Sequence, residues 1–131
     1  MPTMIEQGGA VIINMTSGAG ESDPPVPAGQ GGWGYAYGAG KAAVSRLSGI
    51  ISRELGEQGI KAFTVNPGVV STESLKATIG DKGLIALRNG IAAPELPAAV
   101  LLWLAQNPDA DNFRYQTINA QSFAREKNIT Y

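Results

Sequence analysis

Tyr37 and Lys41 are the residues whose types and spacing most directly indicate chemistry in this sequence. They stand four positions apart in the run Tyr37–Val44, Tyr-Gly-Ala-Gly-Lys-Ala-Ala-Val, so in a helix they share one face, one turn apart. A free tyrosine, with a pKa of about 10, is a poor acid–base catalyst at neutral pH, but a nearby ammonium favours the phenolate. The spacing therefore predicts a phenol that can exchange a proton. The plainer alternative is a surface tyrosine packed over a lysine stem.

Two further sets of residues lie where predicted strands end. The run Asn14–Gly18, Asn-Met-Thr-Ser-Gly, leaves one strand, and the run Asn66–Thr72, Asn-Pro-Gly-Val-Val-Ser-Thr, leaves another. Open α/β sheets bind ligands at the carboxyl ends of their strands. There the Ser17 hydroxyl can hold a carbonyl oxygen, and a Pro-Gly turn lets the backbone approach a flat ligand. Structural alternatives remain open: Ser17 as a turn residue, and Thr72 as the cap of a following helix.

The composition restricts which chemistry is possible. The 131 residues include neither histidine nor cysteine, which removes the commonest general base, the thiolate nucleophile and the commonest metal ligands. We therefore expect no metal site, and acid–base chemistry must come from Tyr, Lys, Asp or Glu. Ten basic and eleven acidic residues, scattered along the chain for a net charge of −1, predict neither a nucleic-acid nor a membrane partner. Short apolar runs and the lack of a signal sequence favour a cytoplasmic protein.

The elements that must position these residues alternate between strands and helices. Apolar, β-branched residues predict a strand buried on both faces at Ala10–Met15, with further strands at Lys61–Asn66 and Tyr115–Ala120. Helical periodicity predicts a helix from Tyr35 to about Gln58 and another over Pro94–Gln106. This order predicts an α/β fold, with residues 1–131 forming a single domain around a parallel sheet with flanking helices.

The rest of the chain is read as connections and ends. Met1–Gly9 and Ser122–Tyr131 are polar and predict no element, whereas Ser17–Gly34 holds six glycines and three prolines and predicts a long loop of functional interest. The long helix is expected to pack on the sheet and also on a partner subunit. Its apolar residues recur at three- and four-residue intervals: Ala36, Ala39, Ala43, Leu47, Ile50, Ile51 and Leu55.

In order and context these motifs resemble the catalytic half of the short-chain dehydrogenase/reductase family. A strand that ends in Ser precedes Tyr-x-x-x-Lys at the start of an Ala-rich helix, and the next strand ends in Asn-Pro-Gly-x-x-x-Thr. The resemblance runs from about Gly8 to Ala120. It implies a three-layer, Rossmann-like parallel sheet cut to about three strands. It also implies an NAD(P)-dependent oxidoreductase that interconverts a carbonyl and a secondary alcohol by hydride transfer, with NAD and NADP both possible.

Carried over to this sequence, the resemblance implies roles for particular residues. Tyr37 would give a proton to the substrate carbonyl oxygen, or take it from the alcohol. Lys41 would favour ionisation of that phenol and hydrogen-bond the nicotinamide ribose, and Ser17 would orient the substrate oxygen. The nicotinamide would be lined by Pro67, Gly68 and Thr72. In position, Ser74–Ala93 corresponds to the family's variable segment that covers the substrate.

The sequence also departs from the family pattern. Family members are usually much longer and begin with a strand and a glycine-rich turn for the pyrophosphate, which the residues before Gly8 do not supply. Gly29–Gly34 resembles such a turn only superficially, because no strand directly precedes it. Ser17 and Tyr37 are twenty residues apart, further than is typical, so the loop between them carries an insertion. The run Asn119–Gln121 stands where the family often has Asp-Gly-Gly.

Two functional hypotheses follow. In the first, the chain is an oxidoreductase, or the catalytic part of one whose upstream half was lost from the recorded reading frame. In the second, it is a non-catalytic remnant that acts as an interaction module through the helix at residues 35–58. An unrelated small binding domain would require all the motifs to be coincidental. Under either hypothesis we expect a homo-oligomer through that helix, and an open sheet edge at the strand that begins with Ala10.

Overall fold

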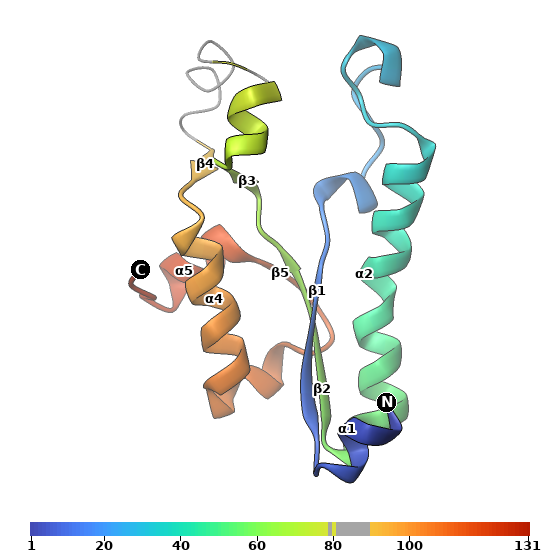
Figure 1. Ribbon diagram of the computed structural model, residues 1–131, viewed down its shortest axis with the longest axis vertical. Coiled ribbons are helices and arrows are strands. Elements are labelled where there is room, and N and C mark those ends of the chain that lie inside the picture. Colours follow the sequence, from blue (N-terminus) through green and yellow to red (C-terminus); the bar gives the residue numbers. More distant parts are fainter. Residues whose placement is uncertain (79, 81–89) are drawn as a thin grey trace.

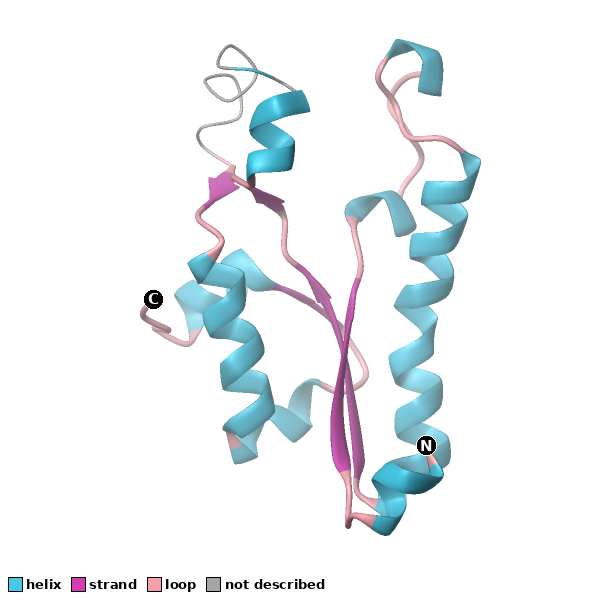
Figure 2. Cartoon of the chain, in the orientation of Figure 1, coloured by secondary structure: helices cyan, strands magenta, loops and turns pink. Residues whose placement is uncertain are grey.

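The chain folds into three layers around a parallel β-sheet (Figures 1 and 2). The computed structural model describes residues 1–78, 80 and 90–131. Strands β1 (Ala10–Met15), β2 (Ile60–Asn66) and β5 (Thr117–Asn119) pair in parallel in the order β1-β2-β5. The predicted α/β class and the parallel pairing of the three predicted strands are confirmed. Half of the predicted substrate-covering segment Ser74–Ala93, namely residues 79 and 81–89, lies outside the described residues.

The helices divide between the two faces of the sheet. Helix α2 (Tyr35–Leu55) packs along β1 and β2 on one face, and α4 (Glu95–Gln106) lies with α5 (Ala120–Glu126) on the other (Figure 1). The helix predicted up to Gln58 ends at Leu55 and continues as the 3-10 turn η3 (Gly56–Gln58) before Gly59. The prediction of a helix over Pro94–Gln106 is confirmed.

Both predicted polar ends contain helices, so that part of the sequence reading was wrong. Helix α1 (Pro2–Glu6) packs Ile5 against the small core beneath α2. In α5, Phe123 and Ala124 are buried, and the Asn119 side chain caps the helix by accepting a hydrogen bond from the Ser122 amide at 3.1 Å. Each helix is one or two turns long, too short for a helical period to stand out in the sequence.

The prediction that the strand at Ala10–Met15 is buried on both faces was also wrong. None of its residues is fully buried, and Val11 is 38% exposed. In the part of the chain described, β1 pairs only with β2 and lies at the edge of the sheet, as the expectation of an open edge required. The buried central strand is β2, in which Ile60, Ala62 and Phe63 are each 0% exposed.

The side chains of β2 alternate between two cores of different character. Ile60 and Ala62 join Ile51 in a small cluster under α2. Phe63 and Val65 point the other way, into a larger cluster with residues of α4, β5 and α5. Three rings of that larger side meet edge to face, with centroids 5.0 to 6.1 Å apart: Trp103, Phe113 and Phe123. This is the arrangement that aromatic quadrupoles favour.

Candidate active site

The site is built at the carboxyl end of β1, where the chain turns toward α2. The ladder with β2 extends one residue past the strand, because the Thr16 amide donates to Val65 O at 2.8 Å. Ser17 then caps the 3-10 turn η1 (Gly18–Gly20), and its Oγ accepts a hydrogen bond from the Ala19 amide at 3.3 Å. The predicted structural role of Ser17 is therefore present. It leaves the hydroxyl hydrogen free to donate to a ligand.

Glycine allows η1 to lie directly against the turn of α2 that carries the candidate residues. A Cβ on Gly20 would fall 2.7 Å from the Lys41 carbonyl carbon and 2.8 Å from the Ala42 nitrogen, distances that real Cβ atoms do not show. A Cβ on Gly38 would meet Ala19 O at 3.4 Å. The segment that begins with Ser17 thus packs on the helical turn between Tyr37 and Lys41, which brings the three predicted catalytic residues to one corner of the molecule.

Tyr37 and Lys41 lie on one side of α2, as their spacing predicted. The Lys41 Nζ is 5.9 Å from the centroid of the Tyr37 ring and donates a hydrogen bond to Met15 O at 3.0 Å. The lysine is therefore anchored to the last residue of β1. Tyr37 is 51% exposed, so its phenol is accessible to a ligand.

Hydroxyl groups hold α2 on the sheet, and the sequence reading missed them. The Thr16 and Ser45 hydroxyls hydrogen-bond each other, and both contact Lys41 O, at 3.3 and 2.9 Å. The Asn14 amide donates to Ser48 Oγ at 2.8 Å, and Ser52 Oγ donates to Ala62 O at 3.3 Å. The only available signal was that these serines recur at three- and four-residue spacing along the helix.

Most of the residues predicted to form the inward, apolar face of α2 therefore do not meet the sheet. The buried residues of the helix are Ser45, Ser48, Ile51 and Ser52. Small serines let the helix approach the strands closely while satisfying polar atoms. Of the residues predicted to pack inward, Ile51 is buried, Leu55 is partly buried, and the others are exposed: Ala36, Ala39, Ala43, Leu47 and Ile50.

The predicted cofactor turn follows β2, the neighbour of β1 in the sheet. The Gly68 amide donates to Asn66 Oδ1 at 2.9 Å, and Gly68 has φ +71°, a backbone region that favours glycine. A Cβ on Gly68 would also fall 2.5 Å from Gln121 Nε2. Because β1 and β2 run in parallel, Pro67 and Gly68 leave the same edge of the sheet as Ser17.

Gln121 and Thr72 hold the segment beyond that turn. The Gln121 Nε2 lies within hydrogen-bond distance of Pro67 O, Val69 O and Gly90 O, at 3.5, 3.3 and 3.2 Å. It links the start of α5 to strands β3 (Val69–Val70) and β4 (Ile91–Ala92), which the sequence reading did not find. Thr72 Oγ1 accepts a hydrogen bond from the Leu75 amide at 3.1 Å, which confirms its predicted role as cap of the helix at residues 73–78.

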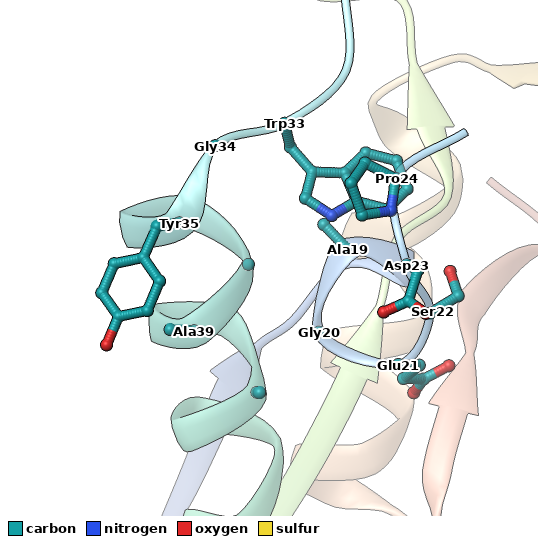
Figure 3. Close-up of a pocket in the computed structure, with 12 residues that line it drawn as sticks. Ala19, Gly20, Glu21, Ser22, Asp23, Pro24, Trp33, Gly34, Tyr35 and Ala39 are labelled. Carbon is teal, nitrogen blue, oxygen red and sulfur yellow. The ribbon is translucent and has the colours of Figure 1, made fainter. Parts of the chain in front are cut away.

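The loop between Ser17 and Tyr37 lines a pocket beside this corner, together with the start of α2 (Figure 3). The pocket measures about 440 Å³, and its lining includes Glu21, Asp23, Trp33 and Gly38. Figure 3 shows Trp33 and Pro24 across the pocket from the helix, with the Tyr35 ring turned away from Trp33. Ser17, Tyr37 and Lys41 do not line it. This pocket is therefore adjacent to the candidate catalytic residues and is not lined by them.

Comparisons with known proteins identify the family. Residues 1–82 match the family model described as short chain dehydrogenase. The short chain dehydrogenase mpl6 of Monascus purpureus is 33% identical over 107 residues, which cover 81% of this chain and 32% of that protein. The NADPH-dependent pterin aldehyde reductase of Arabidopsis thaliana is 33% identical over 81 residues, 62% of this chain and 30% of that one. The chain belongs to the short-chain dehydrogenase family.

Solved structures agree with this assignment. A 7α-hydroxysteroid dehydrogenase in complex with NADH and 7-oxo-glycochenodeoxycholic acid superposes with a TM-score of 0.73 at 27% identity, covering 90% of this chain and 45% of that one. An acetoin dehydrogenase from Enterobacter cloacae gives a TM-score of 0.67 at 26% identity, over 90% and 45% of the two chains. This chain spans about a third of the length of the first curated relatives and just under half of these structures. Across the described residues, no helix combines the length and apolar character needed to cross a membrane.

Proposed function

We propose that this chain carries the proton-transfer site of an NAD(P)-dependent oxidoreductase that interconverts a carbonyl and a secondary alcohol. The observation that carries the proposal is the position of Lys41, whose Nζ is 5.9 Å from the Tyr37 ring centroid and hydrogen-bonded to the end of β1 at Met15 O. That contact sets an accessible phenol and an ammonium beside the turn that begins with Ser17. The relatives' names support the substrate class, because one is an aldehyde reductase and one was solved with a 7-oxo compound.

Each of the three residues has a separate role in the reaction at the substrate oxygen. The Ser17 hydroxyl, already an acceptor for the Ala19 amide, donates its hydrogen to the carbonyl oxygen and orients it. The Tyr37 phenol gives its proton to that oxygen as the alcohol forms. The Lys41 ammonium stabilises the negative charge left on the phenolate. In the reverse direction the phenolate takes the proton back from the alcohol.

The residues present fit the nicotinamide end of a dinucleotide. Lys41 gives one hydrogen to Met15 O, which leaves two N–H groups for ribose hydroxyls. Thr72 Oγ1 is an acceptor within its own turn, so its hydrogen remains free for a carboxamide. Pro67 and Gly68 would lie against the nicotinamide ring. When bound, NADH or NADPH supplies the hydride that reduces the carbonyl carbon.

The proposal is tested by adding NADH or NADPH to the full chain together with a panel of aldehydes and ketones. We expect binding of a reduced cofactor in titration calorimetry, and oxidation of that cofactor that depends on the carbonyl compound. Absence of binding by both cofactors would contradict the proposal and would favour the alternative of a non-catalytic module.

Lys41→Ala separates the proposed role from a general surface effect. Because the lysine would contact both the ribose and the phenolate, its loss should weaken cofactor binding and lower turnover, each by about tenfold or more. The matched control is Lys127→Ala, which removes an exposed lysine at the end of α5 and should change neither. Unchanged binding and turnover in Lys41→Ala would refute the role given to this residue.

We also propose that copies of the chain associate through the outer side of α2. Leu47 and Ile50 are 44% and 52% exposed there, next to a row of exposed alanines. An apolar row of this kind on a helix is typical of an interface. Ile50→Glu should then lower the molar mass measured by sedimentation equilibrium, and a monomeric native chain at micromolar concentration would contradict the proposal.

A further inference from the structure

We propose that the paired hydroxyls of Thr16 and Ser45 are positioning groups, which hold the Lys41 turn of α2 in register with Ser17. The inference rests on the proposed function of Tyr37, Lys41 and Ser17 for its kinetic part. Its structural part, a local clamp between β1 and α2, can be tested without turnover.

The two hydroxyls are buried, and they contact each other and one backbone carbonyl of α2. Thr16 is 3% and Ser45 7% exposed. Thr16 Oγ1 lies 3.3 Å from Lys41 O, Ser45 Oγ lies 2.9 Å from the same oxygen, and the hydroxyls also contact each other. Two hydroxyl hydrogens serve these three contacts, so one donates to the carbonyl and the other joins the two side chains, whichever way they are assigned. In both arrangements Lys41 O gains a hydrogen bond beyond the ordinary helical one.

Thr16 is anchored on the sheet side as well as on the helix side. Its amide donates to Val65 O at 2.8 Å, which ties its backbone to the central strand. Its side chain at the same time reaches the backbone of α2. The residue is therefore a direct link between the buried strand β2 and the helical turn that carries Lys41.

Lys41 is consequently held at both of its ends by consecutive residues. Its carbonyl oxygen is bound by the Thr16–Ser45 hydroxyl pair, and its Nζ donates to Met15 O at 3.0 Å. Ser17 follows Met15 and Thr16 directly in the chain. Of these three adjacent residues, Met15 accepts a hydrogen bond from the ammonium, Thr16 joins Ser45 in holding the helical turn, and Ser17 presents the hydroxyl proposed to orient the substrate.

A small displacement of this turn would separate the proton donor from the oxygen it serves. Misplacement of reacting groups by about 1 Å can cost about a hundredfold in rate. Without the clamp, α2 can move relative to Ser17 while the remainder of its serine contacts, further down the helix, persist. The effect is then expected on the chemical step and not on substrate binding.

The test compares Thr16→Val with Ser52→Ala. Valine keeps the shape of threonine and removes the hydroxyl, whereas Ser52 makes the same kind of buried contact, to Ala62 O at 3.3 Å, far along α2 from Lys41. Thr16→Val should lower kcat by about tenfold or more with little change in KM. Thr16→Ser should restore most of the loss. Ser52→Ala should leave kcat unchanged, even where it lowers the melting temperature as much.

Hydrogen–deuterium exchange provides the readout that needs no substrate. In Thr16→Val the backbone amides of residues 38–45 should exchange faster, while those at the far end of α2 keep their native rates. Unchanged exchange at residues 38–45, or a kcat equal to that of the native chain, would overturn the inference. If the native chain shows no turnover at all, the proposed function fails, and the exchange experiment still decides whether the clamp exists.

Discussion

The two faces of the sheet are held by different forces. On the face of α4 and α5, aromatic and aliphatic side chains pack into one continuous core around Phe63 and Phe123. On the face of α2, the apolar cluster is small, and much of the contact is made by serine hydroxyls and the Asn14 amide. Hydrophobic burial is non-directional, whereas a hydrogen bond requires a particular distance and angle. The helix that carries Tyr37 and Lys41 is thus located by directional contacts, and the opposite layer supplies bulk stability.

The largest effect on stability is expected on the aromatic face. Phe63 is 0% exposed at the centre of the sheet, so Phe63→Ala should lower the free energy of unfolding by about 3–5 kcal/mol, through lost burial and the cavity left behind. Urea denaturation followed by circular dichroism measures this change. If Phe63→Ala lowered the free energy of unfolding by less than the serine variant described next, the aromatic face would not be the main source of stability.

A smaller effect is expected from the polar face. Ser48 is 1% exposed and accepts a hydrogen bond from the Asn14 amide at 2.8 Å. Ser48→Ala leaves that amide without this partner, which should cost about 1–3 kcal/mol in the same denaturation experiment. Asn14→Leu combined with Ser48→Ala removes both polar groups and should recover part of the loss. No recovery in the double variant would show that the hydrogen bond is not the source of the effect.

The smallest effect is expected where a charged pair lies in solvent, outside both faces. The pKa of Glu73 is lowered from its ordinary value of 4.5, because the Lys76 ammonium donates it a hydrogen bond at 2.8 Å and places a positive charge beside the carboxylate. A carboxyl whose pKa is lowered in the folded state adds stability at every pH above its ordinary, unfolded-state pKa. That stability is lost as the pH falls through the lower, folded-state pKa. Full exposure keeps the contribution slight. Lys76→Ala should return the pKa of Glu73 to its ordinary value in a carboxyl NMR titration, with almost no change in melting temperature at neutral pH.

Much of the fold and of the site could be predicted from the sequence. The β-branched runs predicted all three strands of the main sheet. Apolar periodicity predicted the long helix, and the spacing of Tyr37 and Lys41 then predicted that they share one side of it. Short helices such as α1 and α5 could not be found, because their burial depends on partners distant in sequence. The orientation of α2 was misjudged because the apolar residues were expected to face the sheet, whereas three of the four buried residues of the helix are serines.

The contacts that position the site were the least predictable. Thr16 and Ser45 lie 29 residues apart in the sequence, and Gln121 contacts Pro67, which is 54 residues away from it in the sequence. No local pattern marks such pairs, since hydroxyl and amide side chains are equally common in turns and on surfaces. The sequence indicated the chemically conspicuous residues, whereas the groups that hold them in place are visible only in the folded structure.

The central claim is that the polar face carries chemistry through the phenol of Tyr37. The most direct measurement is kcat/KM for carbonyl-dependent oxidation of the reduced cofactor in Tyr37→Phe and in Tyr35→Phe, a control that removes a neighbouring phenol 91% exposed on the same helix. Tyr37→Phe should lower kcat/KM by about a hundredfold or more while cofactor binding and melting temperature stay unchanged, and Tyr35→Phe should behave as the native chain. Native turnover in Tyr37→Phe would contradict the account.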